Sequence, residues 1–272
     1  MIITAKRAAE ICREWYIAFS NMGKGGEKCV LELLDVADTI EALEAALTEP
    51  KNDSMECIVE EELWVGMKTE IMKVKGDWQE VVDDCRATVA KPPLGHEPSG
   101  EWKTAILIAE HEPIRDIWIK WKWRGIKYWI AMHWKTHIWP SRVNTQRTDR
   151  TGVDREKKPQ DAPVDFTGDA NCQHLIDTMR KRLCGQADPQ TRAYAEDLKI
   201  ALRDVQPELS DVLVPNCVYR GGCPEMKCCG MWNEILNYGS NEWFIPLPQV
   251  LPIKSRYELY NEWFYDVHRR QE

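Results

Sequence analysis

The chain has 272 residues, of which 43% are hydrophobic and 29% charged, and its formal net charge is −8. This length suits one large domain or two small ones and is enough to bury a substantial core. The acidic balance argues against a protein that coats nucleic acid non-specifically. No apolar run approaches a membrane span, and the N-terminal residues lack a signal-peptide core. We therefore expect a cytoplasmic protein without a membrane partner.

The first fifty residues predict a helical hairpin. Thr4 caps a helix whose apolar residues recur every four positions, and the glycines at 23–26 end it. A second amphipathic helix follows and ends before Pro50. We expect three parts, namely this hairpin at 1–50, a core at 51–245, and a C-terminal extension at 246–272 with a terminal helix.

The core pattern predicts one modest sheet and many helices, which is an α+β fold with a small mixed or antiparallel sheet flanked by helices. Its clearest strand is 115–124, where apolar residues alternate, and Gly125 is expected to end it. Residues 140–170 are polar and are expected to form a long loop. Helices are expected at 77–90, 99–111, 126–138, 171–185, 188–205, 207–215, 225–236 and 257–271.

Ten cysteines are scattered through the chain, and four of them lie between Cys217 and Cys229. Structural zinc sites usually pair cysteines two to four residues apart, whereas Cys217, Cys223, Cys228 and Cys229 are separated by five, four and zero residues. These spacings favour buried free thiols in a reducing compartment. We expect neither a disulfide framework nor a metal site.

The basic stretch "HWKTHIWPSRVNTQRTDR" at 133–150 has several interpretations. His133 and His137 are four residues apart on one helix face and would suit a metal, but no third ligand is evident nearby. Basic residues interleaved with tryptophans would suit nucleic acid, against the net charge. These basic residues are Lys120, Lys122, Arg124, Lys127 and Lys135.

A third interpretation makes the same stretch a ligand-binding edge. Pro140 turns the chain after His137, so that donors in the loop lie close to the end of the helix. A helix C-terminus repels anions, so side chains must hold any phosphate. The candidates are Ser141, Arg142, Asn144, Arg147 and Arg150. The alternative is an ordinary polar loop with solvated arginines.

The order of elements resembles the flavin-dependent thymidylate synthases over about residues 57–240. "HEP" at 111–113 precedes the strand, and "HW" at 133–134 and "THIWPS" at 136–141 end the next helix. Pro215 and Tyr219 match a Leu-Pro-x-x-x-Tyr segment of that family. The resemblance implies a homotetramer in which NADPH reduces FAD and a methylene group passes from a folate to dUMP.

On this basis we assign site residues. Cofactor binding is assigned to His111, His133, His137, Ser141 and Arg142, and substrate binding to Asn144, Arg147, Arg150 and Tyr219. FAD is the expected cofactor, with NADPH and methylene-folate where the family activity is kept. The expected partner is a nucleotide or another flat anionic small molecule.

The sequence also departs from the family pattern. Thr136 and Ile138 replace the two arginines of Arg-His-Arg, and Asp211 replaces the arginine expected to face the substrate phosphate. Each lost charge-assisted bond is worth about 1.5–3 kcal/mol. Two interpretations remain. The first is a divergent dUMP-type methyl or one-carbon transferase that binds a flavin, a pyrimidine nucleotide or both. The second is a non-catalytic nucleotide-binding or structural protein on the same fold.

Overall fold

The computed structural model describes residues 68–238 and 251–269. They belong to one of the two compact units into which the chain divides, Val59–Glu272. The hairpin predicted at 1–50 lies outside the described residues.

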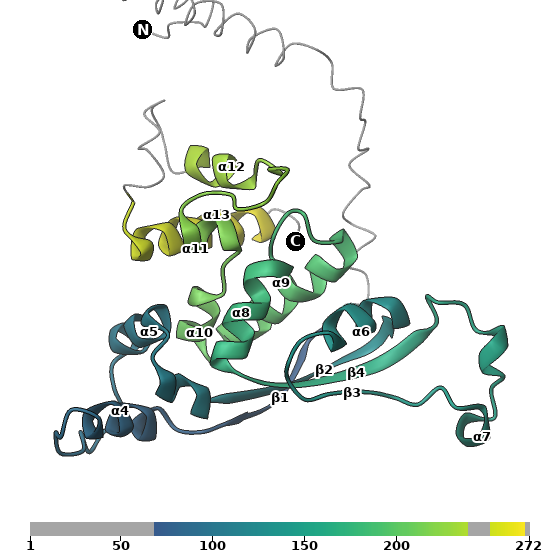
Figure 1. Cartoon of the computed structure of the whole chain (residues 1–272), viewed down its shortest axis with the longest axis horizontal. Coiled ribbons are helices and arrows are strands. Elements are labelled where there is room, and N and C mark those ends of the chain that lie inside the picture. The colour runs from purple at the N-terminus through teal and green to yellow at the C-terminus, as the bar shows by residue number, and fades with distance from the viewer. Residues whose placement is uncertain (1–67, 239–250, 270–272) are drawn as a thin grey trace, which may run out of the picture. The chain divides into compact units, whose positions relative to one another are not determined.

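The described part is an α+β structure, as predicted. Its four strands form one antiparallel sheet in the order β1-β2-β4-β3. The strands are β1 (Glu70–Lys75), β2 (Trp118–Lys127), β3 (Ser141–Val143) and β4 (Pro163–Asn171). Helices α8 (Cys172–Arg182) and α9 (Pro189–Arg203) cover one face of this sheet (Figure 1).

Strand β2 continues through the glycine that was expected to end it. Gly125 has φ +64, and the pairing of β2 with β4 shifts register between Trp123 and Ile126. The glycine therefore forms an irregularity inside the strand, where positive φ suits a residue without a Cβ. Helix α6 (Tyr128–Lys135) is accordingly shorter than the predicted 126–138.

Strand β4 lies inside the segment that was predicted to be a long loop, so that prediction was wrong. Its residues from Val164 to Phe166 alternate between buried and partly exposed, and it pairs with both β2 and β3. Gly168 is required there, because a Cβ on it would lie 2.3 Å from the ring of Trp121. The same segment also contains α7 (Thr148–Thr151) and η2 (Arg155–Lys157).

The predicted helix starts at Asp77, Ser99, Asn171 and Asp188 are confirmed. Each of these side chains accepts a hydrogen bond from a backbone N–H of the first turn that it precedes. Helix α12 begins later than the predicted 225, and α13 begins before the predicted 257. The remaining elements are α4 (Trp78–Ala87), α5 (Gly100–Ala109), η1 (Glu112–Asp116), α10 (Pro207–Val212), α11 (Asn216–Arg220), α12 (Met231–Tyr238) and α13 (Ile253–Arg269).

Tryptophans fill the core between the sheet and its helices. Trp121 and Trp123 on β2 and Trp134 on α6 are fully buried, and their rings meet one another and Trp139 at steep angles, whereas Trp123 stacks on Phe166 at 26°. Edge-to-face packing of this kind is the favoured geometry for aromatic pairs. Most of the tryptophan-rich segment therefore serves the core.

Candidate functional site

Two cavities are lined in part by residues of η1 or of the turn before it. The first, called here the Trp102 pocket, measures about 710 Å³ and lies between α4, α5 and the loop that joins them. The second, the His137 cleft, measures about 460 Å³ and lies between η1, α8 and the residues after α6. Both volumes fall in the range of about 300–1,000 Å³ that is usual for small-molecule sites.

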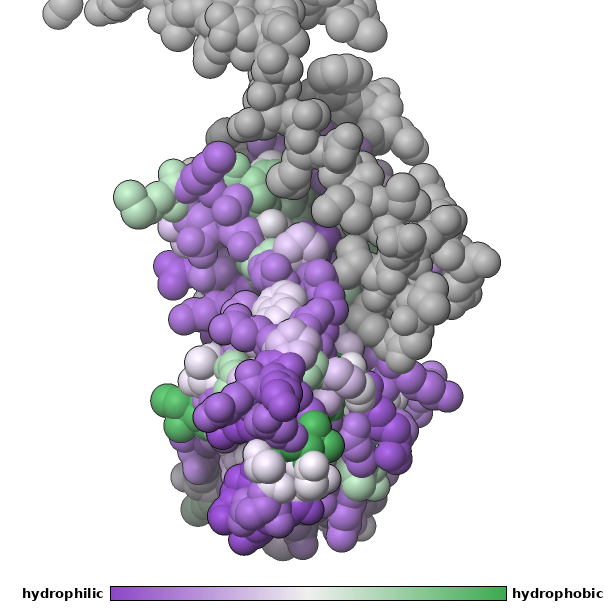
Figure 2. All heavy atoms as spheres, turned by 90° about the vertical axis from the view of Figure 1, so that its right-hand side faces the viewer, coloured by the Kyte–Doolittle hydropathy of each residue, from purple (hydrophilic) through white to green (hydrophobic). Residues whose placement is uncertain are grey.

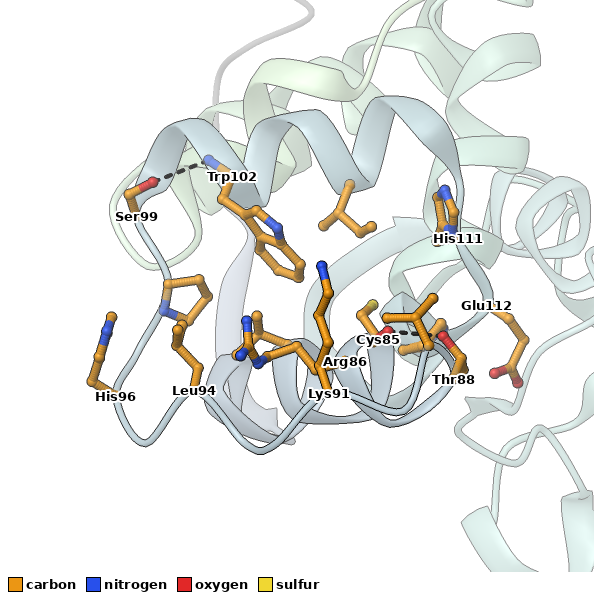
Figure 3. Close-up of a pocket in the computed structure, with 15 residues that line it drawn as sticks. Cys85, Arg86, Thr88, Lys91, Leu94, His96, Ser99, Trp102, His111 and Glu112 are labelled. Atoms are coloured by element: carbon orange, nitrogen blue, oxygen red, sulfur yellow. Dashed lines mark hydrogen bonds between the residues drawn. The ribbon is translucent and has the colours of Figure 1, made fainter.

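The loop of the Trp102 pocket is tied to α4. The backbone N–H of Leu94 donates to Oδ1 of Asp83 at 2.6 Å, and Nε of Arg86 donates to the carbonyl of Pro92 at 2.5 Å. The loop therefore closes one end of the space between the helices. Figure 3 shows the indole of Trp102 projecting from α5 into this space, which the side chains of Arg86 and Lys91 enter from the opposite side.

Charge in the Trp102 pocket is predominantly positive. Arg86 and Lys91 line it together with two histidines, and Glu112 is the one carboxylate among the described residues that line it. Neither Arg86 nor Lys91 takes part in an ion pair within the described ranges. An aromatic face and two cations without a carboxylate partner among the described residues therefore border the same cavity.

In the His137 cleft, the histidine is held as a neutral acceptor. Nε of Arg182 donates to Nε2 of His137 at 2.9 Å, and Nη2 of Arg182 donates to the carbonyl of His133 at 2.7 Å. Burial, followed by the charges of Arg182 and Lys181, lowers the pKa of His137 to about 4. A neutral imidazole that accepts at Nε2 carries its proton on Nδ1. His137 is therefore uncharged near neutral pH.

Two other polar groups of the cleft, Gln173 and Asp177, are bonded to each other and to groups beside the cleft. Nε2 of Gln173 donates to Glu110 at 2.7 Å and to Asp177 at 3.3 Å. Arg180 forms ion pairs with Glu110 and Asp177, and its guanidinium lies 3.6 Å from the ring centre of Tyr219. This network joins α5, α8 and α11. It leaves fewer groups of the cleft free for a ligand.

The structure separates the predicted cofactor residues. His111 lines the Trp102 pocket and His137 lines the His137 cleft. His133 is partly buried, and its Nδ1 lies 3.0 Å from Oγ1 of Thr191. Ser141 and Arg142 belong to β3, opposite Gly168 and Thr167 of β4.

The predicted substrate residues are also separated. Asn144 extends the pairing of β3 with β4, since it exchanges hydrogen bonds with Asp165 at 3.1 and 3.0 Å. Tyr219 lies under Arg180 in the network described above. Arg147 pairs with Asp149 at 2.6 Å, and it immediately precedes the α7 helix that contains Arg150.

The loop after β3 leads away from the His137 cleft. Strand β3 runs from Ser141, opposite Gly168, to Val143, opposite Phe166, so the chain moves toward the start of β4. Helix α8, which borders the cleft, follows the other end of β4. Helix α7 accordingly lies far from α8 (Figure 1). The side that carries α7 faces the viewer in Figure 2, and its described surface is mainly hydrophilic.

A buried lysine was missed by sequence reasoning. Lys199 on α9 is fully buried, and its Nζ donates to the carbonyl of Ser210 at 2.5 Å and to Oδ1 of Asn261 at 2.8 Å. Burial lowers its pKa, and the charge of Asp211 opposes that effect. Burial raises the pKa of Asp211, the predicted charge reversal, and the charge of Lys199 opposes that effect. Through these two hydrogen bonds Lys199 connects α9 to α10 and α13.

Within residues 68–238 and 251–269, no three His, Cys, Asp or Glu side chains are placed so that they could hold a metal ion. Over the same residues, every helix is too short or too polar to cross a bilayer.

Comparisons with known proteins complete the description of the site. No family model and no curated protein matches the chain. A UMP/dUMP methylase PolB from Streptomyces cacaoi, bound with 5-Br dUMP, matches at a TM-score of 0.44 and 11% identity, over 54% of this chain and 94% of that chain. The structure bound with 5-Br UMP matches at 0.41 and 11%, over 54% and 92%. Likeness at this level does not assign the chain to a family or to a ligand.

Proposed function

We propose that this chain is a divergent flavin-dependent thymidylate synthase-like protein that binds a pyrimidine nucleotide or a flavin in the Trp102 pocket. One observation carries the proposal: the indole of Trp102 borders one cavity of about 710 Å³ together with the cations of Arg86 and Lys91, which make no ion pair among the described residues. The element order of the sequence supports the choice of ligand class.

The chemistry of the pocket suits a flat anion. An indole face stacks on a planar base or isoalloxazine ring, and a guanidinium and an ammonium group bind a phosphate through charge-assisted hydrogen bonds. Apolar side chains such as Val82, Leu94 and Ile106 exclude water from the ring. The phosphate would lie toward Arg86 and Lys91, and His111 would contact the opposite end of the ligand.

The proposal extends to activity through the resemblance alone. A flavin held in the pocket would supply redox chemistry for a dUMP-type methyl or one-carbon transfer, and a homotetramer would bring residues of other subunits to the site. The chain's own contribution is to bind and orient the ring and to neutralise the phosphate.

The second candidate function is nucleotide binding without turnover. It is favoured by the bonding of His137, the residue that matches the family's central histidine. His137 is neutral and is engaged by Arg182, so its observed bonds are those of a structural residue. Purified protein without bound flavin and without methyl transfer to dUMP would support this candidate.

Calorimetric titration with dUMP, FMN and FAD tests the binding proposal. We expect at least one of them to bind with a Kd below about 1 mM. Trp102→Ala should weaken that binding by about 1–3 kcal/mol, the usual value of stacking on an aromatic side chain. Trp129→Ala, at another partly buried tryptophan, is the matched control and should bind like wild type. If no compound binds, or if both variants bind equally, the proposal is wrong.

A further inference from the structure

Cys223, Cys228 and Cys229 lie in the loop between α11 and α12, outside both cavities. Cys228 and Cys229 are exposed and Cys223 is partly buried. Met226, midway between Cys223 and Cys228, is fully exposed, so this loop projects into solvent. Reagents in solution can therefore reach it.

Two of these thiols are in direct contact. The side chain of Cys228 lies close enough to that of Cys223 to raise its pKa, with four residues between them in the chain. The backbone N–H of Gly230 also donates to Sγ of Cys228 at 3.4 Å. A thiolate is the reactive form of cysteine, and an exposed thiol can lose its proton to solvent.

Three other described cysteines are less accessible to reagents than Cys228. Cys172, Cys184 and Cys217 are buried, and burial raises the pKa of each, that of Cys217 to about 12. Buried protonated thiols are poor nucleophiles. The contact between Cys223 and Cys228 thus combines proximity with access to solvent.

We propose that Cys223 and Cys228 form a reactive dithiol site that exchanges with low-molecular-weight disulfides and closes into a reversible disulfide within this loop. The exposed thiolate of Cys228 attacks one sulfur of the small disulfide, which forms a mixed disulfide and releases one thiol. Cys223 then loses its proton to solvent and attacks Sγ of Cys228, which releases the second thiol. Two protein thiols are oxidised, and the small disulfide is reduced to two thiols.

Peptide mapping of the full-length protein tests this site with oxidised glutathione as the probe. Trypsin cleaves after Arg220, Lys227 and Lys254, so Cys223 lies in peptide 221–227 and Cys228 in peptide 228–254. After oxidation we expect these two peptides to be joined, and reduction with dithiothreitol should separate them. Cys223→Ser should instead accumulate glutathione on peptide 228–254.

Two further variants identify the partner cysteine. Cys229→Ser should leave the joined peptides at the wild-type level, because Cys229 is outside the exchange. Cys228→Ser should abolish them, although it differs only at the neighbouring position. A link that survives Cys228→Ser but not Cys229→Ser would overturn the assignment. Peptides that stay unjoined in wild type after oxidation would overturn the proposal itself.

Discussion

The Trp102 pocket and the His137 cleft both use the segment around η1, but they differ in how their neutral and acidic side chains are bonded. In the cleft, Arg182 holds His137, and Gln173, Arg180 and Asp177 bond among themselves or to Glu110. In the pocket, Arg86 and Lys91 make no ion pair within the described residues. Arg115 and Lys181 of the cleft are likewise outside any ion pair among the described residues, so what distinguishes the cleft is the bonding of His137, Gln173 and Asp177 within the protein.

The largest expected effect on stability is that of replacing Arg182. Arg182→Leu removes two donors and leaves the acceptors of His137 and His133 unsatisfied, so we expect unfolding to become easier by about 2–4 kcal/mol. Lys181→Leu, at the exposed neighbour on α8, should change stability by about 0.5 kcal/mol or less. Lys91→Leu in the pocket should be equally mild. Urea denaturation measures all three, and an Arg182 variant as stable as the Lys181 variant would contradict this role.

A smaller effect concerns pH. The folded protein holds the pKa of His137 at about 4, below the ordinary value of 6.5, so between these values the unfolded chain binds the proton more readily. The free energy of unfolding should therefore fall as the pH drops from 6.5 to 4. We expect His137 to account for about 1–3 kcal/mol of this loss. His137→Gln should reduce the slope, and an unchanged slope would show that His137 does not titrate in this way.

Local signals in the sequence predicted much of the fold. The caps at Asp77, Ser99, Asn171 and Asp188 are confirmed, since capping depends on the first turn alone. Strand β4 was missed because its short alternation, from Val164 to Phe166, lies in a strongly polar segment. Its partners, β2 and β3, are distant in the sequence or too short to recognise. Pairing of this kind is set by tertiary contacts.

The candidate site was harder to predict, because it depends on how distant elements meet. His111 and His137 were recognised by motif, but the motif does not show that they line different cavities. Trp102 was seen only as a helix residue, and Arg86 and Lys91 belong to a helix end and a proline-rich loop. Their convergence follows from the loop after α4, which runs back along that helix and brings α5 beside it, and no spacing in the sequence reveals this.

The central claim is that the ligand binds in the Trp102 pocket and not in the His137 cleft. The most direct measurement is a titration of two charge-reversed proteins with the tightest of dUMP, FMN and FAD. Arg86→Glu with Lys91→Glu should weaken binding more than 100-fold, since two charge-assisted contacts of about 1.5–3 kcal/mol each are lost. Arg115→Glu with Lys181→Glu, which makes the same change in net charge in the cleft, should leave the Kd within about threefold of wild type, as expected for screened charges at a distance. The opposite pattern would place the ligand in the His137 cleft and contradict the account.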